Sequence, residues 1–144
     1  MNTDDRRFDG ITEKIIGCAY KVGNGLGCGF LEKCYENALA HELRKAGLRV
    51  EQQVPLKVWY DGIVVGEYVA DLIVEGAVLV ELKAIQALEN VHSAQCINYL
   101  AATRLPVCLL INFGKRVDVK RIAGPTLRTE AQSVSIGAPS VAKS

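Results

Sequence analysis

An apolar run broken by two charges constrains this chain more than any other feature of its sequence. Residues 77–85 read Ala-Val-Leu-Val-Glu-Leu-Lys-Ala-Ile, and the unbroken Val-Leu-Val stretch is typical of a central strand buried on both faces. Such a strand needs helices packed against the sheet, which predicts an α/β domain. Glu81 and Lys83 stand out because a charge in a central strand is costly unless it is paired or bound to a metal.

The other elements follow from hydrophobic periodicity and turn signals. Helical spacing covers residues 11–22, 30–46 and 90–103, and apolar, Val-containing runs predict strands at 48–60, 63–74 and 106–113. Asp61-Gly62 and Glu75-Gly76 predict two-residue turns, and residues 117–122 are either a last short strand or the start of a helix. The glycine-rich stretch at 23–29 is interpreted as a tight helix–helix link, with a phosphate-binding loop as the alternative. The predicted order is α-α-β-β-β-α-β, with a mixed central sheet flanked by helices.

A chain of 144 residues suits one domain, which we expect at residues 1–123, followed by a flexible tail at 124–144. That tail holds no aromatic residue and is rich in Gly, Pro, Ser, Thr and Ala. The polar N-terminus and the lack of an apolar run near the roughly 20 residues that span a bilayer predict a cytoplasmic protein. Five cysteines without a C-x-x-C pair argue against a disulfide framework or zinc ribbon and favour buried, reduced thiols.

The net charge of +1 is unevenly distributed. Residues 101–144 contain seven of the 17 basic residues and only two of the 16 acidic ones. A basic C-terminal part could face an anionic partner and an acidic front part could hold cations, although such asymmetry is often only solvated surface.

Three charged residues of two adjacent strands are expected to converge. Strand alternation places Glu81 and Lys83 on one face and Leu82 on the other. The turn at residues 75–76 makes the flanking strands antiparallel neighbours, and pairing about it could bring Asp71 beside the Glu81 region. Two carboxylates can hold Mg²⁺, and a lysine there can orient a water or stabilise a crowded phosphorus centre. The structural alternative is a buried ion pair between Lys83 and either acid, or a strand end that reaches solvent.

Two helices contribute further polar side chains. Glu32 and Tyr35 are three residues apart and share a helix face, as do His92, Gln95 and Tyr99 at positions i, i+3 and i+7. A polar stripe is often the solvent face, and for His92 that interpretation is preferred. Gln95 and Tyr99 are better candidates for the rim of a site or for fixing the lysine.

Taken in order, these blocks resemble a known nuclease pattern. Asp71, nine residues and Glu81-Leu82-Lys83 resemble the split acidic motif of the PD-(D/E)XK nuclease superfamily, although Ala70 stands where that motif has proline. Gln95-x-x-x-Tyr99 looks like the helix motif of its RecB-like branches. Residues 29–35 read G-x-x-E-x-x-Y and are similar to the signature of the small bacterial GxxExxY proteins of that superfamily. Residues 110–114 and 120–122 also look like that family, so the match spans roughly residues 10–122.

The resemblance implies a restriction-endonuclease-like core and a role for each matching residue. Asp71, Glu81 and Glu32 would bind Mg²⁺ or Mn²⁺, and Lys83 would be the catalytic lysine. Gln95 and Tyr99 would be auxiliary residues of the catalytic site. The implied activity is metal-dependent hydrolysis of phosphodiester bonds, with DNA as the expected substrate.

Two other functions stay open at this point. The domain could be a non-catalytic module that grips nucleic acid or a protein on a nuclease fold, or its buried charges could be purely structural. No helix-turn-helix or zinc finger is evident in the sequence, so a nuclease of this kind would recognise structure or ends, or depend on a partner. A homodimer is compatible with the size of the chain, because small nucleases often need a second copy to engage two strands.

Overall fold

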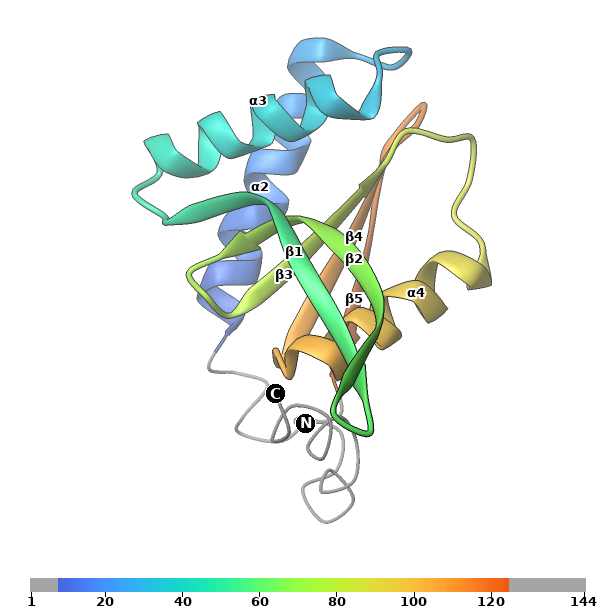
Figure 1. The fold of residues 1–144 in the computed structure, drawn as a ribbon. Coiled ribbons are helices and arrows are strands. Elements are labelled where there is room, and N and C mark those ends of the chain that lie inside the picture. Colours follow the sequence, from blue (N-terminus) through green and yellow to red (C-terminus); the bar gives the residue numbers. More distant parts are fainter. Residues whose placement is uncertain (1–7, 125–144) are drawn as a thin grey trace.

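The computed structural model describes residues 8–124, which form a five-stranded sheet with helices on both faces (Figure 1). The predicted tail at residues 124–144 lies outside the described residues except for Gly124, whose N–H donates to the carbonyl oxygen of Pro106 at 2.8 Å. The elements in chain order are α2 (Asp9–Leu26), α3 (Glu32–Lys45), β1 (Val50–Tyr60), β2 (Ile63–Val74), β3 (Val78–Lys83), α4 (Asn90–Thr103), β4 (Val107–Phe113) and β5 (Val117–Ala123).

The sheet is mixed and has the order β1-β2-β3-β4-β5. Strands β3 and β4 are parallel and are joined through α4, whereas all other neighbours are antiparallel. This confirms the predicted α/β class and mixed sheet. It also decides the open question at residues 117–122, because this segment pairs with β4 along its whole length as a fifth strand.

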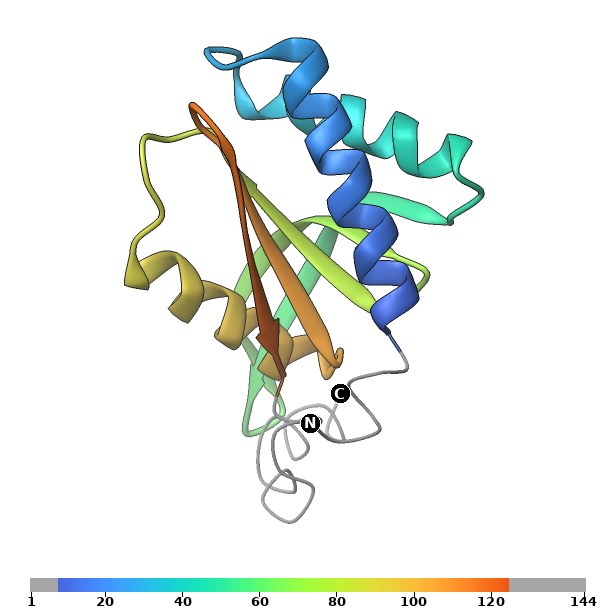
Figure 2. The same cartoon turned by 180° about the vertical axis from the view of Figure 1, so that it is seen from behind.

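Two hydrophobic clusters lie on opposite faces of the sheet. The even-numbered residues of β3 (Val78, Val80 and Leu82) form one cluster with buried side chains of α2 and α3. Leu79 belongs to the other cluster, under α4. Figures 1 and 2 show α2 and α3 on one side and α4 on the other. Strands β3 and β4 are therefore buried on both faces, as the apolar run predicts.

The first helix is longer than its apolar spacing indicates. We expected it to end at Val22, but α2 continues through Gly23 and Gly25 to Leu26. Gly23 is a packing residue, since a Cβ atom there would lie 2.4 Å from Cγ2 of Val117 in β5. Gly23 therefore allows close helix–sheet contact, and only the short stretch 27–31 links the two helices.

In the β1–β2 ribbon, the alternation of side chains between the two faces of the sheet is interrupted at one position. Both predicted turns have two successive residues with positive φ. Asp61-Gly62 is a two-residue turn as predicted, but the loop between β2 and β3 holds three residues, because Val74 pairs with Val78. Within the ribbon, Gln52 pairs with Leu72 and Val54 with Ala70, but Gln53 and Asp71 between them are left out of the pairing. Leu72 packs in the cluster under α2 and α3, whereas Ala70 packs in the cluster under α4. The side-chain alternation therefore shifts by one residue in each strand at this step.

The cysteines are all free, and their burial differs from the expectation. Cys96 and Cys108 are buried and Cys18 is half-buried, but Cys28 and Cys34 are exposed. The prediction of buried thiols is thus wrong for the two cysteines near the α2–α3 connection, where the chain passes over the surface. No helix within residues 8–124 combines the length and the apolar character needed to cross a bilayer.

Candidate active site

Asp71 and Glu81 meet where strands β2 and β3 separate. The ladder between these strands ends at the pair Leu72–Val80, and the two acids occupy the next position on each strand. The backbone N–H of Asp71 donates to Oε2 of Glu81 at 2.9 Å, and the N–H of Leu82 donates to Oδ2 of Asp71 at 2.8 Å. Each carboxylate is therefore held by the backbone of the opposite strand, which confirms the pairing expected from the turn.

Glu81 is buried and Asp71 is half-buried, and the pair is electrostatically strained. Glu81 is only 5% exposed, and burial, followed by the charge of Asp71, raises its pKa to about 8. Burial also raises the pKa of the Asp71 carboxyl. Within residues 8–124, Oε1 of Glu81 has no hydrogen-bond donor, and Oδ1 of Asp71 has only the side-chain amide of Gln53 at 3.4 Å. Two oxygens thus stay available to a cation.

Lys83 lies beside the pair without neutralising it. Its charge opposes the effect of burial at both carboxyl groups and lowers their pKa values. The ion pairs found among residues 8–124 do not include Lys83. The described part of the chain does not form the ion pair of the structural alternative. The other form of that alternative, a strand end that reaches solvent, stays open, because Lys83 is the last residue of β3 and is only half-buried.

Glu32 is less closely associated with the pair than the sequence suggested. It is the first residue of α3 and is exposed. After burial and Asp71, its charge contributes to the raised pKa of Glu81, so it lies within electrostatic range. The described residues nevertheless contain no group of three His, Cys, Asp or Glu side chains placed to hold a metal ion.

The donor set still fits a hard divalent cation. Mg²⁺ prefers oxygen ligands, keeps several waters and is commonly held by one or two carboxylates together with substrate phosphates. Asp71 and Glu81 supply such a pair, with one oxygen of each free of strong protein donors. A bound cation would relieve the repulsion between buried Glu81 and half-buried Asp71.

Helix α4 brings the predicted auxiliary residues to the same region. Nε2 of Gln95 donates to the hydroxyl oxygen of Tyr99 at 3.0 Å. Burial and the charge of Glu81 raise the pKa of the Tyr99 phenol, which places this ring near the acidic pair. His92 has a different role, because its Nδ1 accepts the N–H of Glu89 at 2.9 Å and caps the helix.

Two functional candidates, Glu36 and Gln53, escaped the sequence reasoning. Glu36 is 3% exposed and accepts hydrogen bonds from the amides of Gln52 and Gln53, both at 2.7 Å, and from Nζ of Lys33 at 3.1 Å. The Gln53 amide also contacts Asp71, so one side chain joins the two acids. The available signal was a charged residue among the buried positions 35, 39, 40 and 43 of α3.

Tyr35 of the G-x-x-E-x-x-Y block is a structural residue. Its hydroxyl donates to the carbonyl oxygen of Gly27 at 2.6 Å and accepts the N–H of Phe30 at 3.3 Å. Its ring stacks on Phe113 with 4.6 Å between the centroids. Tyr35 therefore fastens the α2–α3 connection to the end of β4, while Glu32 on the same helix turn faces solvent.

Comparisons with known proteins agree with this architecture. A structure titled "Crystal structure of SSO0001" superposes on this chain with a TM-score of 0.53 and 19% identity, covering 94% of this chain and 68% of that one. That likeness concerns the fold alone. No curated protein matches the sequence. The model of the PD-(D/E)XK nuclease superfamily matches residues 9–122, and the chain therefore belongs to the PD-(D/E)XK nuclease superfamily.

Proposed function

We propose that this protein is a metal-dependent nuclease that hydrolyses phosphodiester bonds, with DNA as its substrate. The observation that carries the proposal is the Asp71–Glu81 pair. Each acid is fixed by the backbone of the opposite strand and keeps an oxygen without a strong donor. Lys83 lies beside the pair but forms no ion pair with it in the described chain. The G-x-x-E-x-x-Y block supports a narrower assignment to the GxxExxY family.

The residues would divide the work as follows. Asp71, Glu81 and Glu32 would hold Mg²⁺ or Mn²⁺, which when bound neutralises phosphate charge and lowers the pKa of a coordinated water. Glu81 must lose its proton to act as a ligand, so its raised pKa makes ion binding depend on pH. The Lys83 ammonium would donate to a phosphate oxygen and stabilise charge that grows during attack on phosphorus.

Gln95 and Tyr99 would act from the α4 side. The amide of Gln95 fixes the phenol of Tyr99, and the buried ring limits water around Glu81. In this proposal the protein works in the cytoplasm, and a homodimer would supply a second site for the opposite strand.

The test is a cleavage panel. Single-stranded, duplex and branched DNA, with matched RNA, are incubated with Mg²⁺ or Mn²⁺ and wild-type, Lys83→Ala or Asp71→Ala protein. Loss of one preorganised charge at a phosphoryl-transfer site costs about 100- to 1,000-fold in rate, and we expect at least that loss for both variants. Lys14→Ala, which removes an exposed lysine of α2, is the matched control and should cut like the wild type. Equal activity in all four proteins would assign the cleavage to a contaminant.

A non-catalytic binding module is the second candidate, and one observation favours it: the described residues contain no three-ligand metal group. Titration of Mn²⁺ into wild-type and Glu81→Ala protein separates the two functions. A nuclease should bind Mn²⁺ in a manner that Glu81→Ala abolishes, whereas a binding module should bind nucleic acid equally well with and without the ion.

A further inference from the structure

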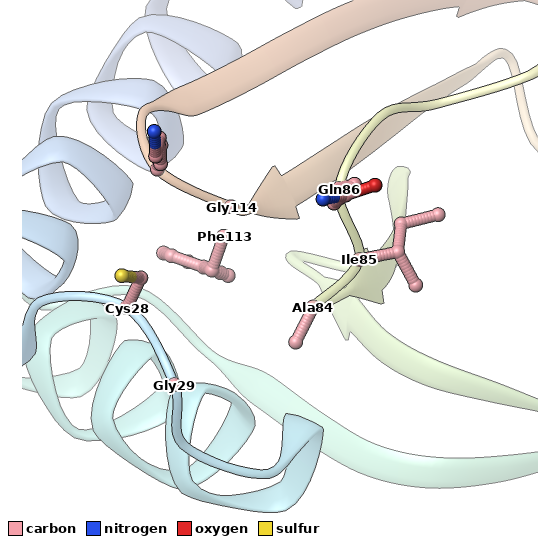
Figure 3. A pocket seen from close by; sticks show the side chains of 8 residues that line it. Cys28, Gly29, Ala84, Ile85, Gln86, Phe113 and Gly114 are labelled. Atoms are coloured by element: carbon pink, nitrogen blue, oxygen red, sulfur yellow. The ribbon is translucent and has the colours of Figure 1, made fainter.

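A pocket of about 460 Å³ lies beyond the strand that carries Glu81 and Lys83. Three segments surround it: the α2–α3 connection at Cys28, the residues after β3 from Ala84, and the turn after β4 up to Lys115 (Figure 3). Strands β3 and β4 are parallel, so the pocket lies outside their carboxyl ends, where open α/β sheets bind ligands. Its wall begins at Ala84, one residue after Lys83 in the chain.

The walls of this pocket are held by specific contacts. The side-chain amide of Asn112 accepts the N–H of Ile85 at 3.0 Å and donates to its carbonyl oxygen at 2.9 Å. Gly114 approaches the same carbonyl so closely that a Cβ atom would lie 2.8 Å from it. Tyr35 fixes the opposite wall through Gly27. The pocket is therefore preformed and does not depend on closure around a ligand.

The lining combines apolar surface with positive charge. Apolar walls come from Ala84, Ile85 and Phe113, and Lys115 stands at the turn. A second pocket of about 210 Å³ shares this turn and adds Arg116. No acidic side chain of residues 8–124 lines either pocket, in contrast to the Asp71–Glu81 pair nearby. A suitable ligand thus has a partly apolar body and a negative charge, and the volume of the larger pocket lies within the roughly 300–1,000 Å³ of small-molecule sites.

We propose that this pocket receives an unpaired nucleotide of the substrate strand, next to the phosphate that is cut, with Lys115 at that nucleotide's own phosphate. The inference rests on the proposed nuclease function and narrows its substrate class. A base inside a duplex is stacked and paired, so it enters such a pocket only at an end, a junction or a flipped position. The protein should therefore prefer single-stranded segments over continuous duplex.

Thiol labelling tests occupancy without relying on cleavage. Cys28 and Cys34 are both exposed, but only Cys28 lines the pocket. Lys83→Ala protein in Mg²⁺ is alkylated with or without single-stranded oligothymidylate or a duplex of equal length, and each cysteine is quantified by peptide mass spectrometry. Saturating single strand should abolish labelling of Cys28 and leave Cys34 unchanged, and duplex should protect neither. Unchanged Cys28 labelling at saturating oligonucleotide, or no binding at all, overturns the proposal.

A charge variant tests the role of Lys115. For single strands, each phosphate contact contributes about 0.7 to the slope of log binding constant against log salt concentration. Lys115→Ala should reduce the slope by about that amount, and the exposed Lys14→Ala should not change it. An unchanged slope in Lys115→Ala removes the lysine from the proposal.

A volume variant tests the pocket itself. Ala84→Phe would fill the cavity. A thermal melt shows whether this variant folds. Weaker binding of single-stranded DNA by the folded variant supports the inference. Gln86→Ala, at an exposed lining position, enlarges the pocket without filling it and serves if Ala84→Phe does not fold. It should alter single-strand binding while duplex binding stays constant, and unchanged binding by it or by folded Ala84→Phe counts against the pocket.

The outcomes of these tests separate this inference from the nuclease function. Cleavage by the wild type without Cys28 protection would overturn only the pocket, whereas protection without cleavage would overturn only the nuclease.

Discussion

Two buried glutamates of this domain have opposite surroundings. Glu36 and Glu81 are 3% and 5% exposed, so both have lost nearly all contact with water. Glu36 accepts three side-chain hydrogen bonds, one of them from the ammonium of Lys33. Glu81 accepts one backbone N–H and faces a second carboxylate. The same side chain is thus satisfied in one place and strained in the other.

The difference separates a structural acid from a functional one. A buried charge without partners costs several kcal/mol, and strongly perturbed acids cluster at functional sites. Glu36 needs no further partner, and through Gln53 it supports Asp71. Glu81 would become a stable ion only if a cation arrived. This contrast leads to three predictions, given in order of decreasing effect.

Catalysis should distinguish the two residues most strongly. Glu81→Gln removes a proposed ligand and should lower kcat/KM by about 1,000-fold. Glu36→Gln keeps the shape of the side chain but weakens its hydrogen bond with Gln53. Mutation of a residue that orients a metal ligand typically lowers activity by about 10- to 100-fold. The measurement is kcat/KM for both variants on the DNA that the wild type cuts best. Equal losses would contradict the division into a supporting and a reacting acid.

The pH dependence of stability should follow Glu81. In the folded protein the pKa of Glu81 is about 8, above the ordinary 4.5 of a glutamate, so the folded state holds the proton more tightly. The free energy of unfolding of metal-free protein should therefore fall as the pH rises from about 4.5 to about 8, by roughly 4 kcal/mol, and stay level above that. Urea denaturation in EDTA at a series of pH values measures this free energy of unfolding.

Two companion experiments test this assignment. Glu81→Gln should flatten the curve, and Mg²⁺ should restore stability to the wild type above pH 8 if the ion binds there. A fall of the same size in Glu81→Gln would assign the titration to another group.

Loss of the cation beside Glu36 should have the smallest effect. The Lys33 side chain is 56% exposed, and exposed ion pairs contribute about 0–1 kcal/mol. Lys33→Ala should lower the free energy of unfolding by no more than that amount, because the amides of Gln52 and Gln53 still satisfy the carboxylate. A loss well above this range would show that Glu36 depends on its counter-charge and would weaken the contrast with Glu81.

The parts predictable from sequence were those governed by local patterns. The Val-Leu-Val run predicted a central strand, and the turn at residues 75–76 set the pairing that places Asp71 opposite Glu81. Positive φ at Glu75 and Gly76 is a local property of the turn. The loop holds three residues, however, so counting outward from a two-residue turn would place Asp71 opposite Val80, one residue short of Glu81. The superfamily assignment rested on four such local blocks in the correct order.

The parts that escaped prediction depend on distant contacts. Glu36 and Gln53 are 17 residues apart, and no turn or motif in the sequence predicts that they contact each other. Gln53 has a φ of 53°, an uncommon value outside glycine. The predicted end of α2 was wrong because Gly23 packs against Val117 of β5. The periodicity of apolar residues along the helix does not reveal this contact.

The interrupted side-chain alternation in the β1–β2 ribbon shows which residues the sheet needs for its own structure and which it does not. Gln53 and Asp71 are one extra residue in each strand, placed opposite one another, and the pairing has the same register on both sides of them. A ribbon lacking both would alternate regularly and still point Gln52, Val54, Ala70 and Leu72 to their present sides. The sheet could therefore be built two residues shorter, and the residues it could spare include the acid on which the proposed chemistry depends.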